Sequence, residues 1–222
     1  MLTVLSQSLI LAAGGILSVG SITIVILLLL SDGGWHSGLA YMLGYVGSYT
    51  LIGVSAVLVG YTVAENSSEE PGNFIPFLFV ILGILLLWLT QNNWRKPPAE
   101  NNESPRLFAI IDNISPPKAF AFGALVTVIN FKNLAIYLSA VSVALVADLS
   151  LPAKLVIVLL DVLVFCAAVI APVLIYVSFP KQSDKQLNWI KRTLEAQRRP
   201  IGIWVPFVFG LIFLIRGIAG LL

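Results

Sequence analysis

Residues 118–147 read KAFAFGALVTVINFKNLAIYLSAVSVALVA, an apolar run that is interrupted near its middle by the polar group NFKN at 130–133. The hydrocarbon core of a bilayer is about 30 Å thick, and about 20 helical residues cross it. The run is long enough, so it predicts a transmembrane helix. A polar group at this depth is costly and is kept mostly where it faces a bundle interior, a partner or a substrate.

The whole chain has the composition of a membrane protein. Of its 222 residues, 58% are hydrophobic and 11% are charged, and the mean hydropathy is +0.95, whereas a soluble domain is about half apolar and a quarter charged. Hydrocarbon satisfies no backbone N–H or C=O group, and the apolar runs lack barrel-strand alternation. We therefore predict an all-α, polytopic membrane protein with six transmembrane helices. The six runs are Val4–Leu30, Ser37–Val63, Phe74–Leu89, Lys118–Ala147, Ala153–Phe179 and Ile201–Leu222.

Lys and Arg in the short connections predict the orientation, because cytoplasmic loops are enriched in these residues. The connections between helices three and four and between helices five and six are basic, whereas the connection between helices two and three carries three Glu residues. We expect both basic connections to be cytoplasmic and both chain ends to lie outside, in the bacterial plasma membrane. The basic residues are Arg95, Lys96, Arg106, Lys118, Lys181, Lys185, Lys191, Arg192, Arg198 and Arg199, and the acidic ones are Glu65, Glu69 and Glu70.

The segment Ser183–Arg199 has the pattern of an interfacial helix. It places Leu187, Ile190 and Leu194 at helical spacing among basic residues, as in helices that lie on anionic lipid. We predict that it lies at the cytoplasmic interface with Trp189 at the level of the headgroups. A topogenic basic loop without a specific lipid site is the simpler interpretation of the same pattern.

The two halves of the chain share the order of their landmarks. FIPFLF at 74–79 opens the third helix and WVPFVF at 204–209 opens the sixth, while LSVGSI at 17–22 and INFKNL at 129–134 lie at corresponding depths. Three helices per half reverse the direction of the second half, so we predict an inverted repeat, an architecture of many secondary transporters. The predicted units are residues 1–91 and 118–222, joined by a cytoplasmic linker, 92–117, that contains a short amphipathic piece, Arg106–Ile114.

Polar residues inside the apolar runs are the candidate site. Lys132 lies about 21 Å along the helix from Lys118 at roughly 1.5 Å per residue, which is deep for a side chain that snorkels to the interface. Asp161 is its candidate partner, either in a structural ion pair or in a proton-coupling pair. The glycines and serines of helix one fit close helix packing or a local break that exposes backbone to a cavity. The predicted transport-pathway residues are Asn130, Lys132, Asn133, Asp161, Ser18 and Ser21.

Other classes of function find little support in the sequence. Cys166 is the only cysteine, which excludes an intramolecular disulfide and a two-thiol relay, and we interpret it as a buried apolar residue. His36, the one histidine, stands in a turn without a Cys or acidic cluster. No catalytic or phosphate-binding motif is present, so we predict no enzyme activity, no cofactor and no metal site. The net charge of +2 does not indicate a nucleic-acid partner.

Several segments carry a family resemblance. They are Pro105–Asp112, PKAFAFGA at 117–124, NFKNLA at 130–135, Ile26–Gly47 and the basic piece Leu194–Ile201. Together they resemble the peptidoglycolipid-addressing family (Gap, or Sap, which includes sulfolipid-addressing proteins) of the lysine-exporter superfamily. The resemblance implies six helices in two inverted three-helix repeats and a role in moving glycolipids to the cell envelope.

The chain departs from that family at two positions. The family usually has Pro after the helix-one Ser and after the helix-four Asn, where this chain has Val19 and Phe131. A Pro removes a backbone N–H group and favours a helix break, so its absence removes one cause of such breaks.

Two functions from different classes fit these patterns. The first is a small transporter or exporter of a lipid or another amphiphilic, anionic envelope substrate, with its cavity between the repeats. The second is a membrane scaffold or assembly factor that transports nothing. A polar cavity that reaches the midplane favours the first, and a solid apolar bundle favours the second. The expected partners are membrane lipids and an unidentified substrate, and the sequence leaves homo-oligomerisation open.

Overall fold

A computed structural model of the protein describes residues 1–31, 34–66, 74–95, 114–179 and 183–221, and every element in these ranges is a helix, as predicted. Glu69, Glu70, Lys96, Lys181 and most of the amphipathic piece Arg106–Ile114 lie outside the described residues. The elements are α1 (Leu2–Ala12), the 3₁₀ helix η1 (Ala13–Leu17), α2 (Val19–Leu30), α3 (Gly34–Asn66), α4 (Phe74–Arg95), α6 (Pro116–Ile129), α7 (Phe131–Val146), α8 (Leu151–Ser178), α9 (Ser183–Ala196) and α10 (Arg198–Leu221).

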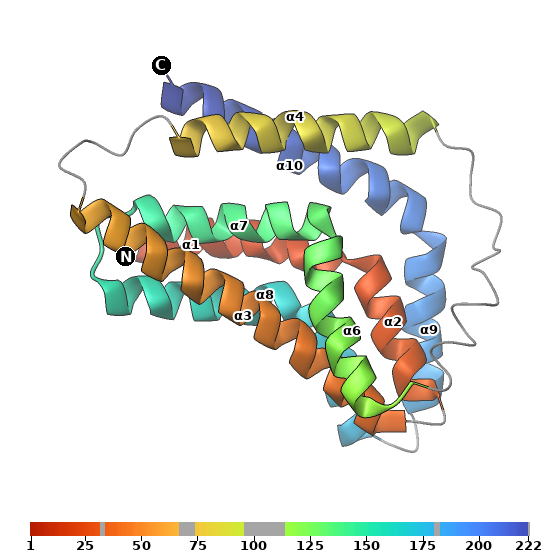
Figure 1. The fold of residues 1–222 in the computed structure, drawn as a ribbon. Coiled ribbons are helices and arrows are strands. Elements are labelled where there is room, and N and C mark those ends of the chain that lie inside the picture. The colour runs from red at the N-terminus through yellow and green to blue at the C-terminus, as the bar shows by residue number, and fades with distance from the viewer. Residues whose placement is uncertain (32–33, 67–73, 96–113, 180–182, 222) are drawn as a thin grey trace.

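The connections and chain ends are sorted to two sides of the molecule (Figure 1). Both chain ends lie at the left of the view, together with the α7–α8 connection. The end of α2, the start of α3 and the start of α6 lie at the opposite, lower right side. This sorting follows from helices that run from one side towards the other, such as α3, α4 and α8.

Several helices are long and apolar enough to cross a bilayer. Among the described residues they are α3, α8 and α10, and the number rises to five if each of two bent pairs, α1/η1–α2 and α6–α7, counts as one span. Large apolar side chains also cover the outside, for example Leu51 at 69% and Ile10 at 70% exposure. Such a surface is suited to lipid. The chain is therefore a membrane protein, and α4, the remaining predicted span, is not among these five.

Both bent pairs break at a polar residue. The axis turns by 56° at Ser18 and by 75° at Asn130. The two residues have nearly the same backbone angles, φ −81°, ψ 73° and φ −80°, ψ 70°. The absence of Pro at Val19 and Phe131 thus does not keep either helix straight. At each break a polar residue, Ser18 or Asn130, stands between the helix that ends and the helix that begins.

Glycines allow two helix pairs to approach closely. A Cβ atom at Gly44 of α3 would overlap the backbone oxygen of Phe120 in α6, and one at Gly123 of α6 would overlap that of Tyr41 in α3. In the second pair, α4 and α10, a Cβ atom at Gly83 would come within 3.0 Å of the Gly210 oxygen. These backbone contacts fix the crossing of each pair, because no side chain fits between them.

The α4–α10 pair lies apart from the remaining helices (Figure 1). One contact between them is made by Phe209 of α10, whose ring occupies the space that a side chain at Gly14 of η1 would need. Phe209 stacks edge to face on the fully buried Phe213, with ring centroids 6.1 Å apart. The larger body, which contains both breaks, meets the α4–α10 pair through η1, α7 and α9.

Candidate functional site

The two helix breaks face each other in the interior of the larger body. The Asn133 amide Nδ2 donates a hydrogen bond to Ser18 Oγ over 2.5 Å, and Ser18 Oγ donates to Ser21 Oγ over 3.0 Å. All three side chains are at most 3% exposed. The structure thus joins these three predicted site residues in one buried polar cluster. Together with Asn130 they form what we call the break cluster (Ser18, Ser21, Asn130 and Asn133).

Asn130 belongs to this cluster through its role as a helix cap. Its side-chain oxygen accepts from the backbone N–H of Asn133 over 3.4 Å, at the start of α7. Ser18 occupies the same place before α2 but makes no side-chain cap bond. The first N–H groups of a helix lack intrahelical partners and carry its positive dipole end. Two such ends, those of α2 and α7, therefore begin at the break cluster and favour a negative charge there.

Lys132 is adjacent to the break cluster but has no acidic partner in the part of the chain that the structure describes. It is half-buried at the second position of α7, and no ion pair joins it to Asp161 in the described chain. Asp161 is fully buried in α8, and neither carboxyl oxygen has a hydrogen-bond partner among the described residues. The proposed Lys132–Asp161 ion pair is thus not formed in this conformation. Among the described residues, neither the Lys132 amino group nor the Asp161 carboxyl group has a polar partner.

Four tyrosines lie next to these residues and were missed by the sequence reasoning. Tyr41, Tyr45 and Tyr49 follow one stripe of α3 at a spacing of four residues, and Tyr137 faces them from α7. Each is at most 1% exposed, and none of their hydroxyls has a hydrogen-bond partner among the described residues. The sequence does contain a signal for this stripe. Tyrosines spaced four residues apart in a helix lie on one face, so three hydroxyl groups share one side of α3.

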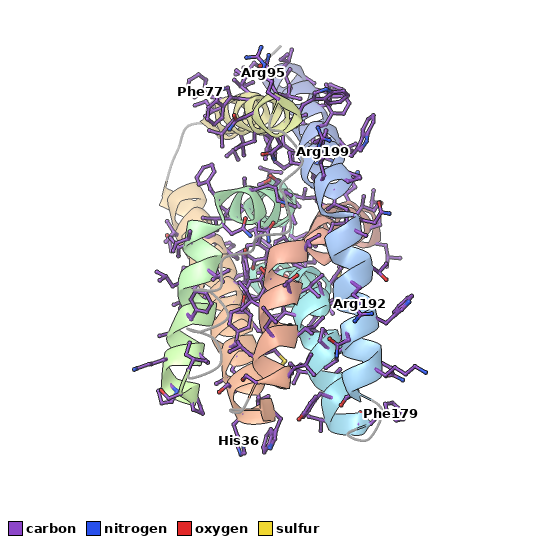
Figure 2. The ribbon with its side chains drawn as sticks, turned by 90° about the vertical axis from the view of Figure 1, so that its right-hand side faces the viewer. His36, Phe77, Arg95, Phe179, Arg192 and Arg199 are labelled. Carbon is purple, nitrogen blue, oxygen red and sulfur yellow. The ribbon has the colours of Figure 1, made fainter. Side chains whose placement is uncertain are left out.

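The amphipathic helix predicted near Ser183–Arg199 is present as α9. Leu187 is fully buried, whereas Trp189 is 68% exposed. Lys185 and Arg192 are exposed as well, and Figure 2 shows Arg192 on the outside of the bundle. The helix thus has one apolar face on the protein and a basic, aromatic outer face, as an interfacial helix requires.

The structure also places three further residues, Cys166, His36 and Lys154. Cys166 is fully buried in the core, as interpreted from the sequence. His36 is exposed in the first turn of α3, with its ring 4.0 Å from that of Trp35 (Figure 2). Lys154, only 7% exposed, donates to the Leu145 carbonyl over 2.7 Å and so satisfies the end of α7. Within the described ranges no group of three His, Cys, Asp or Glu side chains is placed to hold a metal ion.

The break cluster is closed to the outside in this conformation. A shallow groove lies elsewhere, between the last turns of α4 and the start of α10, and none of the break-cluster residues lines it. Its lining residues are Leu87, Thr90, Gln91, Trp94, Arg95 and Phe207. Polar side chains thus lie in the interior, but among the described residues no pocket reaches them, so the polar cavity expected of a transporter is not seen in this conformation.

Apolar helices with a lipid-suited surface and a buried polar cluster at two helix breaks define a helical membrane protein. The model of one family, described as Sap, sulfolipid-1-addressing protein, matches residues 9–219. The chain therefore belongs to the Sap family, which confirms the family resemblance of the sequence. Comparisons with curated proteins and with solved structures gave no match.

Proposed function

We propose that the protein is a six-span exporter of the bacterial plasma membrane that moves an anionic lipid or a similar amphiphile through the break cluster. The observation that carries this proposal is the hydrogen bond between Asn133 and Ser18, which brings two polar helix breaks together in a buried interior. Broken helices that meet at a midplane polar site are the device by which many secondary transporters bind their substrates. The proposal involves no catalytic step, no cofactor and no nucleic acid.

The position of the chain ends supports six crossings. An even number of crossings returns a chain to its starting side, and both ends lie on the same side in Figure 1. The five candidate spans alone would leave the ends on opposite sides. We therefore assign the sixth crossing to α4, which spans 22 residues and packs along α10.

Corresponding geometry in the two halves supports the inverted repeat of residues 1–91 and 118–222. Ser18 and Asn130 share their backbone angles, and each is followed three residues later by a polar member of the cluster, Ser21 or Asn133. The packing pairs also correspond, because α6 packs on α3 while α1 and η1 pack on α8. Exchanging the two halves converts one of these contacts into the other.

The basic residues support cytoplasmic placement of the side opposite the chain ends. Arg95 ends α4 and Arg199 begins α10 on that side, and both lie towards the viewer in Figure 2. Both chain ends then face outwards. Cysteine labelling in a Cys166→Ala background tests this: a cysteine at the exposed Asp148 should react in intact cells, and one at Lys185 only after permeabilisation.

Two features favour an anionic substrate. The N-terminal ends of α2 and α7 meet at the break cluster, and the unpaired Lys132 adds a positive charge beside it. The family description names a sulfolipid as what its members address, so a lipid with an acidic headgroup is the substrate class that we propose. Membrane lipids are accordingly the expected partners, and homo-oligomerisation is left open.

Lipid translocation in liposomes tests this function. Purified protein should move fluorescently labelled phosphatidylglycerol across the bilayer faster than labelled phosphatidylcholine. Lys132→Gln should slow the anionic probe about tenfold, because a hydrogen bond to a charged group contributes about 1.5–3 kcal/mol. Lys185→Gln, the same change on the exposed face of α9, should have no effect. Wild-type protein that moves neither probe faster than empty liposomes would instead favour the scaffold function.

A further inference from the structure

Asp161 stands out as an isolated acid in the protein interior. It is fully buried, and its oxygens have no hydrogen-bond partner among the described residues. Tyr137 of α7 is a titratable group on a neighbouring helix, and its ring packs on Phe165, one turn after Asp161 on α8. On α1, the nearby hydroxyl group is that of Ser8. This hydroxyl donates its hydrogen bond to the Leu5 carbonyl over 3.0 Å and not to Asp161. The neighbouring elements η1 and α2 carry no titratable side chain, and the titratable groups of α3 nearest this region are its buried tyrosines.

Among the described residues, no cation is placed to neutralise this carboxyl group. Lys154, two turns earlier on α8, is engaged with the Leu145 carbonyl, and Lys132 makes no ion pair with Asp161. A bare carboxylate in such surroundings is unfavourable by several kcal/mol. A metal ion would need several oxygen, nitrogen or sulfur ligands, and the described residues do not gather such a set here. A bound proton neutralises the group without any additional ligand.

The buried tyrosines form a continuous series, which we call the tyrosine file (Tyr41, Tyr45, Tyr49 and Tyr137). The ring centroids are 6.1 Å apart for Tyr41 and Tyr45, 5.0 Å for Tyr45 and Tyr49, and 4.9 Å for Tyr49 and Tyr137. Phe165 of α8 packs against the last two rings, with centroids 4.7 Å from Tyr49 and 5.2 Å from Tyr137. A buried hydroxyl without a protein partner is uncommon, and four in series point to water or another ligand between them.

The tyrosine file lies near both the break cluster and the part of α8 that carries Asp161. Tyr137 follows Asn133 of the break cluster by one turn of α7. Its ring lies 5.2 Å, centroid to centroid, from that of Phe165, which follows Asp161 by one turn of α8. The file therefore begins within one helical turn of the proposed substrate site and packs against the turn of α8 that follows the buried acid.

We propose that Asp161 is a proton-binding site and that the tyrosine file conducts its proton to and from the break cluster, so that substrate export is coupled to proton movement. The carboxyl group gives its proton to a water molecule beside Tyr137, the proton passes along the hydroxyls, and the carboxylate takes up a proton from the opposite side. Only O–H bonds form and break. The coupling rests on the proposed export function, whereas proton binding at Asp161 does not.

Infrared spectroscopy of the full-length protein in liposomes tests the proton-binding site. Wild-type protein at neutral pH should show the C=O stretch of a protonated carboxylic acid, and Asp161→Asn should abolish this band. Asp148→Asn, the same change at an exposed acid, should leave it unchanged. Identical spectra of the wild type and Asp161→Asn would overturn the proposal. A band that persists while lipid translocation fails would contradict the export function and leave the proton site intact.

The rate of hydrogen–deuterium exchange of that band tests the path. After transfer to D₂O, the band should shift about tenfold more slowly in Tyr49→Phe than in wild type, because removing one hydrogen-bonding step costs roughly this factor. Tyr176→Phe, which removes a hydroxyl outside the file, should exchange at the wild-type rate. Equal exchange rates in Tyr49→Phe and wild type would show that the file does not carry the proton.

Discussion

The two helix breaks reach the same backbone conformation by different means. At Asn130, a full α-helical segment precedes the break, and the Asn130 side chain caps the helix that follows. At Ser18, the chain first tightens into the 3₁₀ helix η1, and no side-chain cap bond forms. Three residues before each break stands a different residue, Gly15 in the first and Thr127 in the second.

The difference separates local from tertiary causes of a break. A capped break is specified by a few neighbouring residues, so it depends little on the rest of the protein. The first break depends on packing, because Gly15 lies directly against the backbone and ring of Phe165 in α8. The polar residue at this break, Ser18, donates a hydrogen bond to Ser21 and accepts one from Asn133 of the other half. The second break therefore helps to hold the first.

The largest expected effect is at Gly15. A Cβ atom there would lie 2.5 Å from the Phe165 backbone oxygen, so Gly15→Ala should lower the free energy of unfolding by about 3 kcal/mol through overpacking. Gly20→Ala is the matched control, since no atom lies within 4 Å of its added Cβ, and it should be neutral or slightly stabilising. Thermal unfolding of the purified variants measures both. Equal effects of the two substitutions would remove packing as the cause of the first break.

A smaller effect is expected from the hydrogen bond that joins the breaks. Ser18→Ala should cost about 2 kcal/mol, because the buried Asn133 amide loses its acceptor. In an Asn133→Leu background the same change should cost much less, which gives a coupling energy of about 1–2 kcal/mol in a double-mutant cycle. Additive costs in that cycle would mean that the two breaks do not support each other.

The smallest effect is expected at the capped break. Asn130→Ala should cost about 1 kcal/mol, the usual value for a lost helix cap. Asn130→Ser keeps a capping oxygen and should restore most of this stability. If both variants are as stable as wild type, the 75° bend at Asn130 has another cause than its side chain.

Much of the fold could be predicted from apolar runs, because hydrocarbon requires helices of a given length. The predicted run Val4–Leu30 appears as α1, η1 and α2, and the run Lys118–Ala147 as α6 and α7. The polarity of Ser18, Ser21, Asn130 and Asn133 inside these runs singled them out in the sequence, and the structure brings the four together. Charge and polarity are costly in an apolar helix, so their positions carry information even in a single sequence.

The parts that escaped prediction depend on contacts between distant segments. Lys132 and Asp161 were paired because opposite charges in adjacent spans attract, but the rotation of α7 and α8 about their axes decides whether they meet. The tyrosine file was missed for a similar reason. A tyrosine in an apolar run is compatible with a membrane interface as well as with a core, and only the α3–α7 contact places Tyr137 beside Tyr49.

The most direct test of the central claim is to map where an anionic lipid headgroup binds. A phosphatidylglycerol analogue with a photoreactive group on its headgroup should label peptides around residues 13–21 and 127–134, and Lys132→Gln should reduce this labelling. An analogue of phosphatidylcholine should label these peptides far less. Labelling confined to α9 and to the outer faces of α4 and α10, with none at the two breaks, would contradict the claim that the break cluster is the transport site.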